Sequence, residues 1–269
     1  MRRIMAGHIY LGSNLKMYKT ARQTQDYLLN LSMSIGDLSR RDLTVFIIPS
    51  FTSLDRARRT IHKGDILLGA QNMHWEDEGQ FTGEISPLML EDLGVEVVEI
   101  GHSERRHVMG ETDAAVNRKT LSALAHGFIC LLCVGETAEQ KALGLSDETL
   151  RTQLKTGLWG VPTDSLDRLW IAYEPVWAIG VGGTPASEDY ADGKHAVIKH
   201  CLSEMYGSVA GRVPVLYGGS VNRGNCDALA AMPHIDGLFI GRAAWDANAF
   251  NEIIRAVLPV FQRKQGMVK

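Results

Sequence analysis

The sequence lacks any long apolar segment. No run approaches the roughly 18 consecutive apolar residues that a membrane-spanning helix needs, so we expect no membrane partner. Two arginines near the start precede a short apolar stretch, but His8 and Tyr10 interrupt it, and this pattern does not fit a secretory signal peptide. These absences predict a soluble, cytoplasmic protein.

The chain also lacks a dominant charge and has few cysteines. With 28 basic and 31 acidic residues the net charge is -3, so we expect no nucleic-acid partner. Two of the four cysteines, Cys130 and Cys133, have the spacing of a redox or zinc pair. They lie in an apolar run, residues 128–134, where positions three apart point to opposite faces of a strand. The histidines show no metal-binding spacing, and we predict neither a metal nor another cofactor.

What the sequence does contain is an alternation of short apolar runs with longer amphipathic segments. Eight runs are candidate strands: residues 8–12, 44–48, 66–71, 95–101, 128–134, 169–173, 213–217 and 237–240. Helix-like segments span residues 21–35, 86–93, 114–125, 146–157, 188–205, 223–231 and 247–261. This pattern predicts an α/β fold, a single (β/α)8 barrel domain over residues 1–269. An open doubly wound sheet fits less well, because no Gly-x-Gly-x-x-Gly turn follows the first strand.

A carboxylate directly follows one of the predicted buried strands. Glu174 stands at the end of the run at residues 169–173, and Pro175 bars further ladder bonding. In a parallel barrel the carboxyl ends of the strands face the active-site mouth, so Glu174 is a candidate base. Taken alone, such a residue more often caps a loop or pairs with a cation. The next loop has a stiff entry and glycines at 180, 182 and 183, which is typical of a lid.

Other strand ends carry further reactive groups. Lys16 follows the first strand, where it suits an electrophile or an anion clamp; His102 follows the fourth strand and begins a helix, whose dipole favours neutral imidazole. Either residue alone is more often a solvated lysine or a structural histidine. The seventh and eighth strands lead into glycine-opened turns, residues 217–222 and 240–244, which suit a phosphate site. Together these strand ends predict a phosphate site beside a base.

The connection after the third predicted strand is unusually long. This loop, residues 72–84, carries Met73, Trp75 and Phe81 without any periodicity. Loops of this length are usually functional or dock onto something. Exposed apolar groups of this size often mark an interface, so subunit contact is the favoured interpretation.

Several runs of the sequence together resemble the triosephosphate isomerase family. They comprise residues 14–16, 69–72, 81–86, 101–106, 133–137, 172–180 and 217–221, and the resemblance extends from the first strand to the last helix. It implies that Glu174 moves a proton between the carbonyl carbon of a phosphorylated ketose and the adjoining carbon, while neutral His102 polarises the enediolate oxygens. Lys16 would supply positive charge, Asn14 a hydrogen bond, and Glu104 would orient Lys16.

The same resemblance implies how the substrate's phosphate is bound. The backbone of Gly180, Ser220, Gly241 and Arg242 would hold the phosphate of a small phosphorylated sugar. Closure of the loop after Pro175 would exclude water and stop the enediolate from expelling phosphate.

The resemblance also implies self-association. Members of the family are homodimers in which the long third loop enters the pocket of the partner. Thr82 would lie at the tip of this loop, with Met17 nearby. Met73, Trp75 and Phe81 would then contribute to the dimer interface.

The sequence departs from the family pattern in places that touch the substrate region. Leu15 stands where the family usually has Trp, and Tyr18 where it usually has Asn. The lid gains Gly183 and Pro185 and lacks its usual Lys, and Arg242 replaces the second glycine of the eighth-strand turn. The residues expected to carry the chemistry are nevertheless present. This combination indicates the same reaction on a somewhat different substrate.

We therefore expect an aldose–ketose phosphate isomerase. Interconversion of dihydroxyacetone phosphate and glyceraldehyde 3-phosphate, a reaction of glycolysis and gluconeogenesis, is the first choice. The alternative is the same isomerisation of a four-carbon ketose phosphate, L-erythrulose 1-phosphate or D-erythrulose 4-phosphate. A barrel that binds a phosphorylated ligand without turnover is less well supported, because a binding module has no need of the base Glu174.

Overall fold

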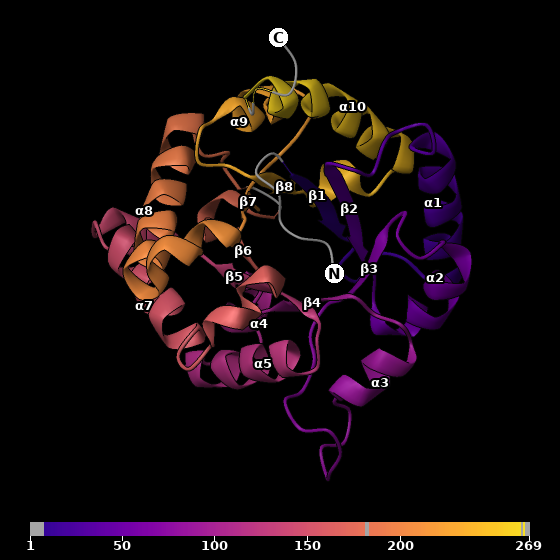
Figure 1. Cartoon of the computed structure of the whole chain (residues 1–269), viewed down its shortest axis with the longest axis horizontal. Helices are drawn as coiled ribbons and strands as arrows, with labels where there is room; N and C mark the ends of the chain where they lie inside the picture. The colour runs from indigo at the N-terminus through magenta and orange to yellow at the C-terminus, as the bar shows by residue number, and fades with distance from the viewer. Residues whose placement is uncertain (1–7, 181–182, 265, 267–269) are drawn as a thin grey trace.

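The computed structural model describes residues 8–180, 183–264 and 266, and within them the strands form a closed barrel. The strands follow one another around the barrel in chain order (Figure 1). Their bounds are β1 (Ile9–Asn14), β2 (Leu43–Ile48), β3 (Leu67–Ala70), β4 (Val97–Ile100), β5 (Ile129–Val134), β6 (Leu169–Tyr173), β7 (Val215–Tyr217) and β8 (Gly237–Phe239). All neighbouring strands pair in parallel, and β8 closes onto β1. The predicted (β/α)8 barrel is confirmed.

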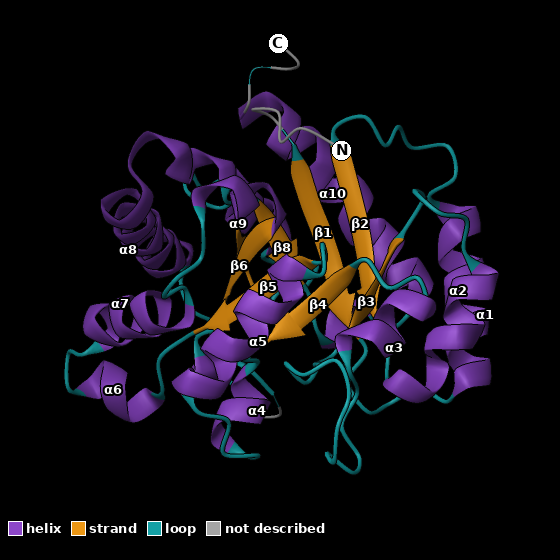
Figure 2. Ribbon diagram, turned by 60° about the horizontal axis from the view of Figure 1, so that its bottom comes forward, coloured by secondary structure: helices purple, strands orange, loops and turns teal. Residues whose placement is uncertain are grey.

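Helices surround the barrel as an outer layer (Figure 2). They are α1 (Ala21–Ser34), α2 (Leu54–Thr60), α3 (Pro87–Asp92), α4 (Ser103–His107), α5 (Asp113–Ala125), α6 (Ala138–Ala142), α7 (Ser146–Gly157), α8 (Glu188–Tyr206), α9 (Cys226–Ala231) and α10 (Ala247–Lys264). The predicted helical segments correspond to α1, α3, α5 and α7 to α10. The sequence did not predict α2 and α6 and indicated only the start of α4, because helices of five to seven residues show little amphipathic period. The equally short α3 and α9 lie within longer predicted segments.

Local capping signals explain where several of these helices begin. Thr20 and Thr137 each form a capping box with a glutamine three residues later, at the starts of α1 and α6. Ser86 caps α3, whose first residue is Pro87. These side chains satisfy backbone N–H groups that a helix cannot satisfy internally.

The core has two layers, which the alternation of side chains along each strand separates. Inside the barrel lie Tyr10, Phe46, Ile48, Val97, Leu131, Cys133, Trp170, Ala172, Leu216 and Phe239. The larger layer packs between strands and helices and includes Cys130. Both Cys130 and Cys133 are buried free thiols on opposite faces of β5, as the sequence predicted.

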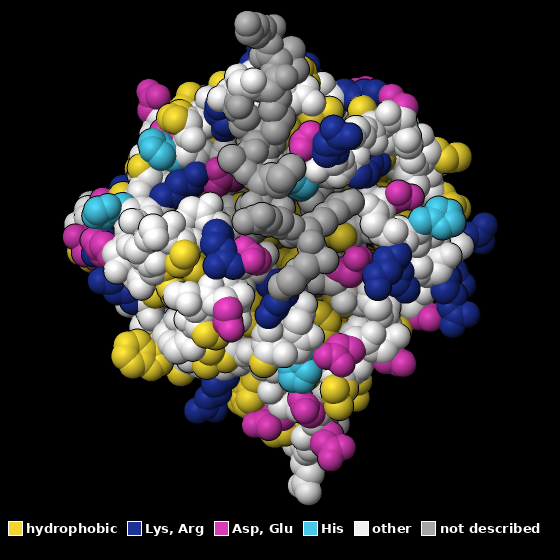
Figure 3. All heavy atoms as spheres, viewed as in Figure 1, with side chains coloured by type: hydrophobic (Ala, Val, Ile, Leu, Met, Phe, Trp, Pro, Cys, Tyr) yellow, Lys and Arg dark blue, Asp and Glu magenta, His cyan; other side chains and the backbone are white. Residues whose placement is uncertain are grey.

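The surface agrees with the balanced composition. On the face shown in Figure 3, Lys and Arg side chains are interspersed with Asp and Glu. The loop between β3 and α3 protrudes from the body (Figure 1), and its exposed residues include Glu76, Asp77, Glu78 and Glu84. Among the described helices, none combines the length and the apolar character needed to cross a membrane.

Candidate active site

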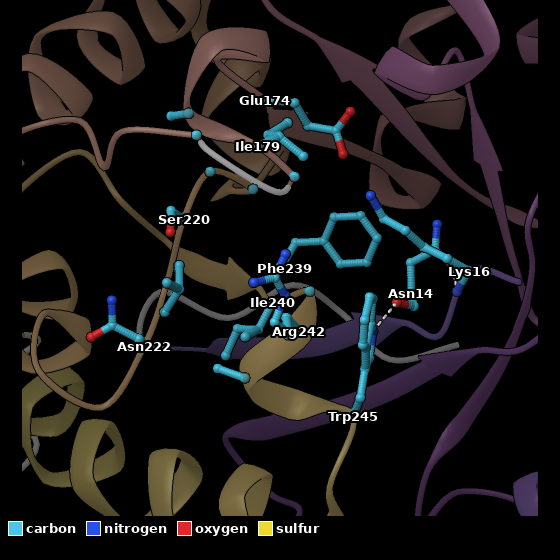
Figure 4. Close-up of a pocket in the computed structure, with 18 of the residues that line it drawn as sticks. Asn14, Lys16, Glu174, Ile179, Ser220, Asn222, Phe239, Ile240, Arg242 and Trp245 are labelled. Carbon is cyan, nitrogen blue, oxygen red and sulfur yellow. Dashed lines mark hydrogen bonds between the residues drawn. The ribbon is translucent and has the colours of Figure 1, made fainter. Parts of the chain in front are cut away.

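The carboxyl ends of the strands surround a cavity of about 370 Å³. Its lining includes Asn14, Lys16, His102, Glu174, Gly180, Ser220, Gly241 and Arg242, all predicted from the sequence. Figure 4 shows Glu174 on one side of this space, Asn14 and Lys16 on another, and Ser220 with Asn222 on a third. The fold thus gathers into one site groups that lie up to 228 residues apart in the chain, from position 14 to position 242.

Glu174 is held at the end of β6 by the neighbouring strands. Its backbone N–H donates to the carbonyl of Val134 at 2.8 Å, and the residue is only 2% exposed. Oε2 accepts a hydrogen bond from the backbone N–H of Ser103 at 3.0 Å, while Oε1 lies 3.4 Å from Nε2 of His102. The close approach of β5 leaves no room beside it, because a Cβ at Gly135 would lie 1.8 Å from the Glu174 carbonyl oxygen.

His102 caps the N-terminus of α4, and this position fixes its tautomer. Nδ1 accepts a hydrogen bond from the backbone N–H of Glu104 at 3.1 Å. A nitrogen that accepts cannot carry the proton, so the neutral ring bears its proton on Nε2. That N–H faces Glu174 and the cavity, where it can donate to a substrate oxygen.

Lys16 adopts a strained backbone conformation, with φ of 50°, and is the one non-glycine with positive φ among the described residues. Its backbone N–H donates to Oδ1 of Asn14 at 2.7 Å. Its ammonium group donates to Oε1 of Glu104 at 2.7 Å, and Glu104 is the residue that the resemblance implies orients Lys16. The ammonium group is therefore fixed at the edge of the cavity.

Asn14 is held by residues that the sequence reasoning missed. Gln71 donates to its Oδ1 at 3.0 Å, and its own Nδ2 donates to Oε2 of Glu99 at 2.7 Å. The indole N–H of Trp245 donates to its carbonyl at 2.9 Å. Glu99 could have been found, because it is a charged residue within an otherwise apolar strand. Trp245 gave no comparable signal.

Two of the sequence departures are explained by packing around this end of β1. Leu15 is fully buried in the outer core. Tyr18 packs against Trp245 with ring centroids 4.3 Å apart. An aromatic wall, composed of Tyr18 and Trp245, therefore stands beside the carbonyl of Asn14.

The opposite part of the cavity suits a phosphate group. Ser220 and Gly241 line it, and a short 3₁₀ helix, Arg242–Ala244, follows the glycine. Gly219 must be glycine, since a Cβ would lie 2.3 Å from the hydroxyl oxygen of Tyr217. Arg242 does not have positive φ, so the loss of glycine here costs no backbone strain. Its side chain lines the cavity and makes no ion pair with the described residues.

The predicted lid begins with a 3₁₀ helix, Val176–Ala178. Trp177 donates through its indole N–H to Glu136 at 2.9 Å, and Glu136 also accepts from the hydroxyls of Tyr173 and Tyr190. Gly180 has φ of 86°, a conformation that glycine adopts readily. Val181 and Gly182 of the predicted lid lie outside the described residues.

The predicted interface residues differ in exposure. Met17 is 94% exposed and Phe81 is 44% exposed, while Thr82 is also exposed. Trp75 is half-buried, and His74 stacks against it and contacts Phe81. Met73 is 0% exposed in the core of its own subunit, so no partner is needed to cover it.

Comparisons with known proteins agree with this geometry. The family model of triosephosphate isomerase matches residues 9–257. The chain is 45% identical over 258 residues to the L-erythrulose-1-phosphate isomerase of Rhizobium etli, covering 95% of this chain and 94% of that protein. The enzymes of the same name from Mesorhizobium japonicum and Rhizobium meliloti are 46% and 43% identical, covering 91% and 93% of this chain and 95% and 96% of theirs. The chain therefore belongs to the triosephosphate isomerase family of sugar-phosphate isomerases.

Proposed function

We propose that the protein interconverts L-erythrulose 1-phosphate and D-erythrulose 4-phosphate. The observation that carries this proposal is the identity of 43–46% over more than nine-tenths of the chain to enzymes named L-erythrulose-1-phosphate isomerase. The sequence alone favoured the triose reaction, and with it a place in glycolysis. The relatives favour the four-carbon alternative.

The chemistry of this conversion requires only the groups in the cavity. L-erythrulose 1-phosphate has its carbonyl at C2, between the carbon that bears phosphate and C3. Removal of the C3 proton gives a 2,3-enediolate, and return of a proton to C2 moves the carbonyl to C3. Numbered from the other end, the product is D-erythrulose 4-phosphate. The substrate is thus dihydroxyacetone phosphate with one hydroxymethyl group added to the carbon that loses its proton.

Each step has a suitable group in the site. Glu174 takes the C3 proton and returns it to C2, because its carboxylate is buried beside the cavity and fixed by Ser103. The Nε2–H of His102 donates to the developing oxyanion and moves protons between the two oxygens. Lys16 and Asn14 complete the stabilisation of the enediolate, since both line the same side of the cavity.

The phosphate of the substrate occupies the part of the cavity lined by Ser220, Gly241 and Arg242. Backbone N–H groups of the loops after β7 and β8, together with that of Gly180, bind it. The lid after Pro175 closes over the bound substrate and excludes water.

The substrate assignment is tested by comparing kcat/KM for L-erythrulose 1-phosphate and dihydroxyacetone phosphate under identical conditions. We expect a preference of about tenfold or more for the four-carbon substrate, because a site shaped for an extra hydroxymethyl group leaves that space and its polar groups unused by the triose. Equal or better turnover of dihydroxyacetone phosphate would return the assignment to the triose reaction.

Arg242→Gly is expected to raise KM about tenfold for both substrates while their kcat/KM ratio stays unchanged. The guanidinium lines the cavity next to Gly241 and has no ion-pair partner among the described residues, so it is free to bind phosphate. Hydrogen bonds to charged groups contribute about 1.5–3 kcal/mol, which corresponds to at least tenfold in affinity. Arg242→Lys is the matched control for charge without the planar fork. A changed ratio would instead place Arg242 at the sugar hydroxyls.

We also propose that the protein acts as a homodimer through the loop at residues 72–84. The support is the exposure of Phe81 on a protruding loop and of Met17 beside the site, since large exposed apolar groups mark interfaces. Thr82 and Trp75 extend the same surface.

A further inference from the structure

The barrel interior contains a carboxyl group that the reaction as described above does not use. Glu99 lies on β4, is 0% exposed, and neighbours the apolar inner layer of the barrel. It forms no ion pair with the described lysines and arginines. Burial of a carboxyl group without a cation is costly, so an ordinary core position would hold an apolar side chain.

Glu99 determines how Asn14 presents its amide. Oδ1 of Asn14 already accepts from the backbone N–H of Lys16 and from Gln71. One hydrogen of its Nδ2 is donated to Glu99 at 2.7 Å. The second N–H is left for the cavity that Asn14 lines. Without the carboxyl group of Glu99, Nδ2 of Asn14 would lose the hydrogen bond that holds it in this orientation.

Glu99 is also close to the groups proposed to carry the chemistry. An oxygen of Glu99, a ring nitrogen of His102 and an oxygen of Glu174 all lie within 4.8 Å of one another. A negative charge on Glu174 at this distance opposes ionisation of Glu99. Burial is the main cause that raises the pKa of Glu99 to about 7, and the charge of Glu174 adds to it.

Neighbouring groups partly offset the effect of burial on the pKa of Glu99, and a charge on His102 is the strongest of these opposing influences. Lys16 approaches from the loop after β1, and its charge lowers the pKa of Glu99. From β5, Sγ of Cys133 donates to Oε1 of Glu99 at 3.8 Å. Arg106 reaches the carbonyl of Cys133 from α4. The group is therefore poised between its two protonation states near neutral pH.

We propose that Glu99 is a positioning residue that fixes the amide of Asn14 and retains a proton while Glu174 is ionised, so that its ionisation limits activity at alkaline pH. The inference concerns the site of the proposed isomerase and rests on that function. A second negative charge beneath the cavity opposes the enediolate that forms above it. Activity is therefore highest when the pair of carboxyl groups holds one proton.

The experiment compares pH profiles of kcat/KM for the wild type and Glu99→Gln. Glutamine keeps an oxygen that accepts from Asn14 but cannot ionise. As the pH rises and Glu99 ionises, we expect kcat/KM of the wild type to fall about tenfold within one or two pH units. Glu99→Gln should stay within about threefold of wild type at the acidic side and lack that decline. If kcat/KM of Glu99→Gln fell at alkaline pH as it does in the wild type, the proposal would be overturned.

Two further variants separate positioning from stability. Glu99→Val removes the acceptor and cannot ionise, so it should lower kcat/KM about tenfold on the acidic side and show no alkaline decline, whereas an effect on thermal unfolding alone would show a merely structural role. Cys133→Ser replaces the thiol that donates to Glu99 with a hydroxyl, a stronger donor that favours the ionised form of Glu99. The alkaline decline in kcat/KM should then occur at lower pH. If the decline in Cys133→Ser occurred at the same pH as in the wild type, the result would contradict the assignment of this decline to Glu99, even if Glu99→Gln failed to fold.

The control is Glu96→Gln, which makes the same change at a carboxylate just before β4 that pairs with Arg58 and does not line the cavity. It should keep the wild-type profile. All profiles use whichever of L-erythrulose 1-phosphate and dihydroxyacetone phosphate the wild type converts faster. If the substrate assignment is wrong, the measured preference between the two substrates will show it, while the pH profiles still test the role of Glu99.

Discussion

Glu174→Gln should lower kcat by about 10²–10⁴-fold while substrate still binds. The amide has nearly the shape of the carboxylate and can keep the contact with the backbone N–H of Ser103. It cannot accept the proton from carbon, so the enediolate does not form by this route. The measurement is steady-state kinetics in both directions, combined with exchange of the substrate proton with solvent deuterium.

A control for the Glu174 variant is Glu139→Gln, an exposed carboxylate in the first turn of α6. It should leave kcat unchanged. If the Glu174 variant isomerised substrate within a few-fold of wild type, another group would have to be the base. Because Glu174 is buried between β5 and the start of α4, unfolding curves of the variant should be recorded alongside its kinetics.

Met17→Asp is expected to give a monomer with activity reduced about 100-fold. Met17 is 94% exposed, and a charge there cannot be covered by the apolar surface of a partner. The loss of activity follows because Lys16, the adjoining residue, has a strained backbone that the dimer would hold in place. Displacement of a catalytic group by about 1 Å can cost 10² in rate. Sedimentation and kinetics over a range of protein concentrations measure both effects.

Met33→Asp provides the matched control, because Met33 on α1 is 73% exposed and lies outside the proposed interface. It should remain dimeric and active. A wild-type protein that sedimented as an active monomer would contradict the dimer. A dimeric Met17→Asp variant would show that Met17 lies outside the interface.

The parts of the fold that could be predicted are those with a strong one-dimensional signal. The run at residues 169–173 is apolar because β6 is covered on both faces, and its predicted bounds are those observed. The helix at Ser103–His107 has no such signal, since five residues make little more than one turn. Its start was nevertheless implied by His102, whose ring nitrogen caps it.

The residues of the candidate site also divide into those that the sequence predicts and those that it does not. Glu174 directly follows β6 and Lys16 lies two residues after the end of β1, so parallel topology alone brings them to one end of the barrel. Trp245 reaches the carbonyl of Asn14 across 231 residues of sequence, and no spacing in the chain encodes that contact. Glu99 is a different case. Its charge within an apolar strand is visible in the sequence, but its hydrogen bond to Asn14 is not.

The glycine at position 135 bears on how this enzyme can be adapted to other phosphorylated sugars. Its backbone is clamped by Gln153, which donates to its carbonyl and accepts from its N–H, and any side chain would collide with the carbonyl of Glu174. A library randomised at 135 would return almost only glycine among folded, active clones. Diversity is better placed at Tyr18 and Arg242, since Arg242 lines the cavity and Tyr18 packs against the Trp245 ring beside it.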